Sequence, residues 1–140
     1  MNNGGDIVVI EDDHSAQFFM DEILSTIELK NKVRFFSDSI DALEFLKRSK
    51  VSPFIIFSDV NLPKLNGFEI KAMIDEDQRL RALCIPFIFY STGATRSDIT
   101  QAYYIGAQGY FQKAANPEEF VNNIKVIISY WSMSFVPQDI

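Results

Sequence analysis

The sequence has few of the residues on which covalent or metal cross-links depend. Its 140 residues include one cysteine, Cys84, and one histidine, His14. A single cysteine excludes an internal disulfide and fits a cytoplasmic location, and we expect Cys84, in an apolar stretch, to pack as a small hydrophobic side chain. A lone histidine without a cysteine nearby argues against a zinc site, so we expect His14 to be exposed in the first turn of a helix.

Positive charge and long apolar runs are also scarce. The chain has 13 Lys and Arg against 19 Asp and Glu, a net charge of −6 and a pI near 4.7. Proteins that bind the phosphates of nucleic acids need a basic face, so we expect no nucleic-acid partner. No run reaches the roughly 18 apolar residues of a membrane span, and the polar first five residues do not resemble a signal peptide. We therefore expect no membrane association.

What the chain does have is a regular alternation of short apolar runs with amphipathic segments. We expect strands at 7–10, 33–36, 54–57, 87–90 and 110–111, and helices at about 16–27, 38–49, 66–80, from 95 and from 116. Strands alternating with helices predict an α/β fold, a (βα)5 doubly wound parallel sheet with helices on both faces. With 47% hydrophobic residues, residues 1–140 suit one domain with a core over about 6–130, a short C-terminal tail and no output domain.

Polar residues follow four of these strands at the point where each strand ends. They are Glu11 and Asp12 after the first strand, Asp59 after the third, Ser91 after the fourth and Lys113 after the fifth. The carboxyl ends of parallel strands share one edge of the sheet, so these groups are expected to meet in one crevice. Crowded carboxylates need a cation, hard oxygen ligands favour Mg²⁺, and a lysine beside them suits a visiting phosphoryl group. The pattern predicts a metal-assisted phosphoryl-transfer site.

Each fragment has a plainer interpretation when it is read alone. The acidic run at 11–13 could be the start of a helix, the segment 59–67 an ordinary loop, Ser91 a turn residue and Lys113 a surface charge. Asp59 carries the most specific signal, since a carboxylate oxygen is a competent nucleophile toward phosphorus. It is the joint placement at the strand ends that favours a functional site.

The chain resembles the receiver domains of two-component response regulators over nearly its whole length. The elements that carry the resemblance are Ile10-Glu11-Asp12-Asp13, Asp59 with Leu62-Pro63 and Asn66-Gly67, Ser91-Thr92-Gly93, and Gly106-Ala107-Gln108-Gly109-Tyr110-Phe111-Gln112-Lys113. The resemblance implies a flavodoxin-like three-layer fold with strand order 2-1-3-4-5. It also implies that Asp59 accepts a phosphoryl group from a sensor histidine kinase or histidine phosphotransfer protein, and that the chain acts as a stand-alone switch in a phosphorelay, not as an enzyme.

The same resemblance implies a role for each remaining site residue. Asp12 and Asp59 would bind Mg²⁺ directly, Glu11 through water and Asn61 through its backbone carbonyl. The phosphoryl group would be met by Lys113, Ser91 and Thr92, with Tyr110 turning inward behind it. Asn61, which is small and polar, and Gly93, which has no side chain to shield the path of the water, would set the lifetime of the phosphorylated state. The downstream protein, unknown from the sequence, would bind the surface formed by the helix from 95, the strand at 110–111 and the last helix.

Two residues depart from the family pattern. Ala114 stands where the family usually has a proline, commonly after a cis peptide bond, so the sequence leaves open whether Lys113–Ala114 is cis. Ser91 stands where threonine is commoner, but it keeps the hydroxyl.

Two other functions fit parts of the sequence. A phosphohydrolase of the haloacid-dehalogenase type also uses a strand-end aspartate with Mg²⁺, but its second acid falls here on Asn61, which cannot donate a proton as an acid. A degenerate receiver acting only as a binding module is disfavoured by the complete set of site residues. No G-x-G-x-x-G follows the first strand, which excludes a dinucleotide-binding fold.

Overall fold

A five-stranded sheet organises the molecule, a computed structural model that describes residues 4–50, 52–113 and 116–137. The strands are β1 (Ile7–Ile10), β2 (Val33–Phe36), β3 (Ile55–Ser58), β4 (Phe87–Ser91) and β5 (Gly109–Gln112). The helices are α1 (His14–Ser25), α2 (Ser39–Arg48), α3 (Gly67–Glu76), α4 (Gln78–Leu83), α5 (Arg96–Tyr104) and α6 (Pro117–Met133).

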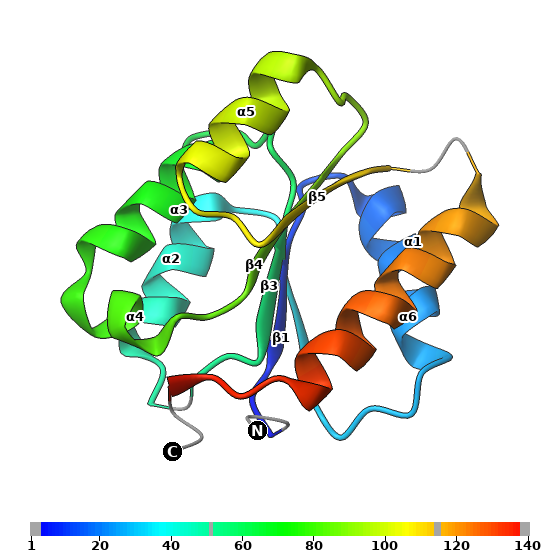
Figure 1. Ribbon diagram of the computed structural model, residues 1–140, viewed down its shortest axis with the longest axis horizontal. Helices are drawn as coiled ribbons and strands as arrows, with labels where there is room; N and C mark the ends of the chain where they lie inside the picture. Colours follow the sequence, from blue (N-terminus) through cyan, green and yellow to red (C-terminus); the bar gives the residue numbers. More distant parts are fainter. Residues whose placement is uncertain (1–3, 51, 114–115, 138–140) are drawn as a thin grey trace.

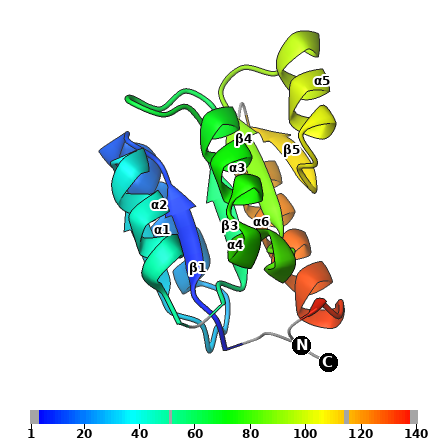
Figure 2. The same cartoon turned by 90° about the vertical axis from the view of Figure 1, so that its left-hand side faces the viewer.

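All neighbouring strands are parallel, in the order β2-β1-β3-β4-β5. Helices α1 and α6 cover one face of the sheet, and α2, α3, α4 and α5 cover the other (Figure 1). Figure 2 shows the same layers from the side, with α2 and α3 in front of the strands and α6 behind them. The predicted doubly wound, three-layer fold is therefore confirmed. Within the described ranges no helix is both long enough and apolar enough to cross a membrane.

The core consists of two clusters, one on each face of the sheet. In β1, Val8 and Ile10 join the cluster under α2, α3, α4 and α5, whereas Ile7 and Val9 join the cluster under α1 and α6. This alternation follows from the two-residue period of a strand. Because both faces are covered, the strand residues of β1, β3 and β4 are buried without exception, which explains why they read as continuous apolar runs.

The single helix expected over 66–80 is wrong: the structure has two helices, α3 and α4, that meet at Asp77. The Asp77 backbone is extended, its N–H donates to the last turn of α3, and its side chain accepts the N–H of Leu80 at 3.0 Å in α4. Aspartate favours such a cap because its carboxylate satisfies free N–H groups. Leu80 lies seven residues after Met73, so the helical spacing of apolar residues continues across the break and hides it in the sequence.

The expectation for Cys84 is also wrong. Cys84 is exposed and adopts the left-handed conformation, with φ 50°, at the end of α4. Its N–H donates to the carbonyl of Arg81, and this tight helix end turns the side chain outward. His14 is exposed as the first residue of α1, as expected.

Candidate functional site at the carboxyl edge of the sheet

The two-residue alternation of the strands sorts the site residues onto two sides. In β1, β3 and β5 the side chains of Val9, Phe57 and Phe111 face α1 and α6. Two residues further along each chain segment stand Glu11, Asp59 and Lys113. They therefore leave the sheet on one side, which we call the acidic side. The carboxylate of the adjacent Asp12 joins them there.

Three carboxylates come together on the acidic side. Glu11, Asp12 and Asp59 each place an oxygen within 4.8 Å of the others. Glu11 is 0% exposed and Asp59 is buried, whereas Asp12 is exposed at the rim. A compact set of carboxylate oxygens, partly open to solvent, has the ligand type that a hard divalent cation requires.

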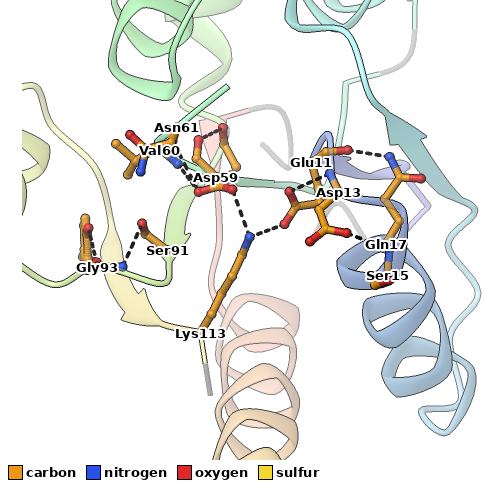
Figure 3. Close-up of polar contacts among 12 residues, drawn as sticks. Glu11, Asp13, Ser15, Gln17, Asp59, Val60, Asn61, Ser91, Gly93 and Lys113 are labelled. Atoms are coloured by element: carbon orange, nitrogen blue, oxygen red, sulfur yellow. Dashed lines mark hydrogen bonds and ion pairs between the residues drawn. The ribbon is translucent and has the colours of Figure 1, made fainter. Parts of the chain in front are cut away.

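Lys113 joins two of these carboxylates (Figure 3). Its Nζ donates to Oδ2 of Asp59 at 2.9 Å and to Oε1 of Glu11. Burial lowers the pKa of Lys113, but the carboxylates of Glu11 and Asp59 more than offset this effect, and the pKa is raised overall. Lys113 is therefore a fixed positive charge at neutral pH, and it reaches the site although no proline follows it. The Lys113–Ala114 peptide lies outside the described residues.

Glu11 is held in an environment that opposes its charge. Burial raises its pKa, and the hydrogen bond from Lys113 and the N–H of Asp13, at 3.2 Å from Oε2, only partly counter this. Asp13 itself caps α1 by accepting the N–H of Ser15 at 2.9 Å. The third acid of the run at 11–13 thus belongs to the helix start, as its plainer interpretation suggested, while the first two belong to the cluster.

The loop after β3 fixes Asp59. Its Oδ1 accepts the N–H of Val60 at 2.7 Å and of Asn61 at 3.4 Å. At Gly67, the first residue of α3, an added Cβ would lie 2.3 Å from the carbonyl oxygen of Asp59. Gly67 is therefore required because two backbone segments approach closely, and not because of its backbone conformation. The residue with a positive φ in this loop is Lys64, at 68°.

The other side of the site, which we call the switch side, consists of Ser91, Gly93 and Tyr110. The Tyr110 hydroxyl donates to the carbonyl of Gly93 at 2.8 Å, and Ser91 Oγ accepts the N–H of Gly93 at 3.4 Å. Phe89 and Tyr110 pack in the cluster under α5, so these residues leave the sheet opposite to Lys113. Thr92 is exposed, and its carbonyl accepts a hydrogen bond from Gln112.

The sequence interpretation missed Tyr90. It was expected only as the end of an apolar strand, yet it lies against the acidic side: Nζ of Lys113 stands 4.9 Å from the centre of its ring. The contact follows from the register of β4 with β3, which the sequence alone does not give: Phe89, the residue before Tyr90, pairs with Ser58, the residue before Asp59.

Comparison with known proteins decides the family. Residues 7–125 match the sequence model of the response regulator receiver domain. The chain belongs to the response regulator receiver domain family. The receiver domain is a signalling domain of two-component systems, in which receivers are phosphorylated by histidine kinases.

Individual relatives agree with this assignment. The chain is 25% identical over 130 residues to response regulator Rcp1 of Synechocystis, covering 89% of this chain and 87% of Rcp1. The crystal structure of the phosphorylated cyanobacterial phytochrome response regulator RcpA is similar with a TM-score of 0.83 and 26% identity, covering 96% of this chain and 99% of RcpA. The receiver domain of sensor histidine kinase PA1611 from Pseudomonas aeruginosa, which has a magnesium ion in its active-site cleft, has the same fold, with a TM-score of 0.75, 23% identity and coverage of 94% and 99%.

Proposed function

We propose that this receiver accepts a phosphoryl group on Asp59 from the phosphohistidine of a sensor histidine kinase or histidine phosphotransfer protein. The observation that carries the proposal is the position of Asp59, between Lys113 at 2.9 Å and two further carboxylates. A phosphoryl group on Asp59 would account for the nearby ammonium of Lys113, and a bound cation would account for the cluster of carboxylates. That the chain acts in the cytoplasm stays a prediction.

The acidic side would hold the metal ion. Asp12 and Asp59 are assigned as direct ligands, Glu11 as a ligand through water and the backbone carbonyl of Asn61 as a further oxygen. The all-oxygen donor set and the exposure of Asp12 to solvent favour Mg²⁺, which usually keeps several waters. When bound, Mg²⁺ would neutralise the phosphoryl oxygens and hold them in line for transfer.

In the transfer, the protein would contribute mainly the positions and the charges of its side chains around the phosphoryl group. A carboxylate oxygen of Asp59 attacks phosphorus, the bond from phosphorus to the donor histidine nitrogen breaks, and that nitrogen keeps the electron pair. Lys113, already 2.9 Å from Asp59, is placed to follow the new phosphoryl oxygens. In the later hydrolysis of the aspartyl phosphate, a water in line with the Asp59 oxygen would attack phosphorus, and the bond from phosphorus to Asp59 would break to release phosphate and the free carboxylate. This self-phosphorylation and self-dephosphorylation is the only chemistry that we assign to the chain.

The switch side would couple phosphorylation of Asp59 to a conformational change at the protein surface. Ser91 and Thr92 are assigned to bind a phosphoryl oxygen, and the movement of Ser91 would let Tyr110 turn inward from its bond with Gly93. The Ser91 hydroxyl is buried and accepts the Gly93 N–H at the long distance of 3.4 Å, a weak bond that its recruitment would break.

The partner surface that we propose lies on α5, β5 and α6. Tyr103 and Tyr104 are exposed on α5, the latter by 90%. Between β5 and α6 there is a hollow of about 390 Å³ lined mainly by apolar and aromatic side chains, including Phe111, Tyr130 and Trp131. Aromatic groups of this kind are enriched in protein interfaces, and Tyr110 links the surface to the site.

Incubation with Mg²⁺ and a small phosphodonor tests the proposal. We expect an acid-stable, base-labile adduct on Asp59, with no adduct in Asp59→Asn. Asp12→Asn should weaken Mg²⁺ binding and abolish phosphorylation, since the cluster loses its exposed carboxylate. Asp21→Asn, an exposed acid on α1, is the matched control and should behave as the wild type. Unchanged Mg²⁺ affinity in Asp12→Asn would contradict the metal assignment.

A further inference from the structure

The hydroxyl of Tyr90 is buried and has no hydrogen-bond partner among the described residues. Tyr90 is 2% exposed, near the carboxyl end of β4. Buried polar groups are nearly always bonded, and one that is not, at a functional site, calls for a physical explanation.

The strand register places this residue in the acidic side. Ser58 pairs with Ile10 on one neighbouring strand and with Phe89 on the other. The residues that follow these three are Asp59, Glu11 and Tyr90, which form the next row across the sheet. Tyr90 packs in the cluster under α1 and α6, the side from which Glu11 and Lys113 also emerge.

The hydroxyl lies beside the Glu11 carboxylate. Burial raises the pKa of Tyr90 well above its usual value of 10.0, and the charge of Glu11 raises it further, followed by that of Asp59. The hydroxyl therefore keeps its proton at neutral pH and is a donor. The Glu11 carboxylate already accepts Lys113 on Oε1 and the Asp13 N–H on Oε2, and the resting structure holds no hydrogen bond from the Tyr90 hydroxyl to either oxygen.

Glu11 needs a replacement donor if Lys113 moves. Glu11 is 0% exposed, and among the described residues its carboxylate accepts two hydrogen bonds, from Lys113 and from the Asp13 N–H at 3.2 Å. A phosphoryl group on Asp59 would draw the ammonium of Lys113 toward its oxygens. A buried carboxylate that loses its donor is strongly unfavourable, so the departure of Lys113 would be opposed unless another donor is at hand.

We propose that Tyr90 is a positioning residue that donates its hydroxyl hydrogen to Glu11 when Lys113 turns to a phosphoryl group on Asp59. The phosphorylation that moves Lys113 rests on the proposed function. The replacement of Lys113 by Tyr90 as the donor to Glu11 depends only on the loss of the bond between Lys113 and Glu11. Among the described residues, the resting state leaves the Tyr90 hydroxyl without a partner, so it is free to donate when Lys113 leaves.

A double-mutant cycle tests the replacement without metal or phosphoryl group. Tyr90→Phe keeps the ring that packs against Lys113 and removes only the hydroxyl. In the wild-type background we expect the urea midpoint to stay the same or to rise. In a Lys113→Met background, at pH 8, we expect Tyr90→Phe to lower the folded-to-unfolded ratio by about tenfold, the size expected for a hydrogen bond to a charged group. Equal effects in the two backgrounds would overturn the proposal.

Beryllofluoride, a phosphoryl mimic, gives a second test that does not depend on the folding of Lys113→Met. In the presence of Mg²⁺ we expect Tyr90→Phe to weaken beryllofluoride binding about tenfold, again the size of one charge-assisted hydrogen bond, and to leave the Mg²⁺ dissociation constant unchanged. Tyr104→Phe removes the same atom from an exposed side chain and is the matched control. Unchanged beryllofluoride affinity in Tyr90→Phe would count against the proposal.

The two tests separate this inference from the proposed function. Suppose that the wild type binds beryllofluoride and forms the Asp59 adduct, but Tyr90→Phe has equal effects on stability in the two backgrounds and leaves beryllofluoride affinity unchanged. The role of Tyr90 is then wrong and the receiver function stands. If the wild type forms no adduct, the double-mutant cycle still decides whether Tyr90 replaces Lys113 at Glu11.

Discussion

The acidic side and the switch side of this site differ in how firmly their polar atoms are held. On the acidic side, Lys113 bonds to the buried carboxylates of Glu11 and Asp59. On the switch side, Ser91 Oγ accepts a backbone N–H at the long distance of 3.4 Å, and the Tyr110 hydroxyl donates to a carbonyl. Charge and burial thus fix the side that would bind ions, while weak neutral contacts leave the other side able to rearrange.

The largest expected effect comes from removing the central carboxylate. Asp59→Asn should abolish phosphorylation completely, because the amide is not a nucleophile toward phosphorus. The free energy of unfolding should change by no more than about 1 kcal/mol, because Asn keeps the acceptor for the Val60 N–H and Lys113 keeps its bond to Glu11. Phosphodonor labelling and urea denaturation measure both quantities. A loss of several kcal/mol would show that Asp59 is needed for the fold.

Lys113→Met tests whether the acidic side is held by charge. The substitution keeps the apolar stem but leaves Glu11 buried without its ammonium partner. We expect the metal-free protein to lose about 3 kcal/mol of unfolding free energy, the usual cost of breaking a buried pair. Lys125→Met, an exposed lysine on α6, is the control. A loss as small as that of the control would contradict the assignment of Lys113 as the partner that stabilises Glu11.

Gly93 offers a way to alter the switch side without straining it. A Cβ at Gly93 would meet no atom within 4 Å, so a side chain fits there. In the proposed geometry, Asn61 and Gly93 flank the path of the hydrolytic water, and a glycine leaves that path open. Gly93→Tyr should slow dephosphorylation about tenfold, which corresponds to ~1.4 kcal/mol in the barrier. Decay of the labelled aspartyl phosphate measures the rate, and a rate equal to or above the wild-type value would show that access does not limit the lifetime.

Ser91→Ala should separate the two sides of the site. Because the bond that the Ser91 hydroxyl accepts from Gly93 is long, at 3.4 Å, we expect the unfolding free energy to change by less than about 1 kcal/mol. Phosphorylation of Asp59 should persist, but a beryllofluoride complex should show Tyr110 still bonded to Gly93. In the wild-type complex Tyr110 should have moved. The same Tyr110 rotamer in the free and the beryllofluoride-bound wild type would contradict the switch.

The smallest expected effect is a pH dependence from Glu11. Its pKa is raised in the folded protein, chiefly by burial, so the folded state holds a proton that the unfolded chain has lost just above pH 4.5. The contribution of Glu11 to stability therefore falls as pH rises from 4.5 through the raised pKa. Without Mg²⁺, the stability of the wild type relative to Glu11→Gln should decrease over this window. A constant difference between the two proteins would contradict the raised pKa.

Local sequence patterns were sufficient to predict the strands and the edge of the sheet at which the site lies. The runs at 7–10 and 33–36 are strands over those same residues, and Asn116 and Pro117 begin α6 as expected. Short-range periodicity and capping decide these features. Because parallel strands end at a common edge, the order of residues along the chain was enough to gather Glu11, Asp59 and Lys113.

The tertiary structure decided what depends on contacts between distant segments. Asp77 divides a helix whose apolar spacing continues unbroken, and Gly67 is required because α3 begins against the carbonyl of Asp59. Lys113 reaches Asp59 without the proline of the family, and Tyr90 enters the site through the register of β4 with β3. The sequence determined which chemical groups reach the edge of the sheet, because strand periodicity is local. Which of them touch was decided by the packing of strands that lie dozens of residues apart in the chain.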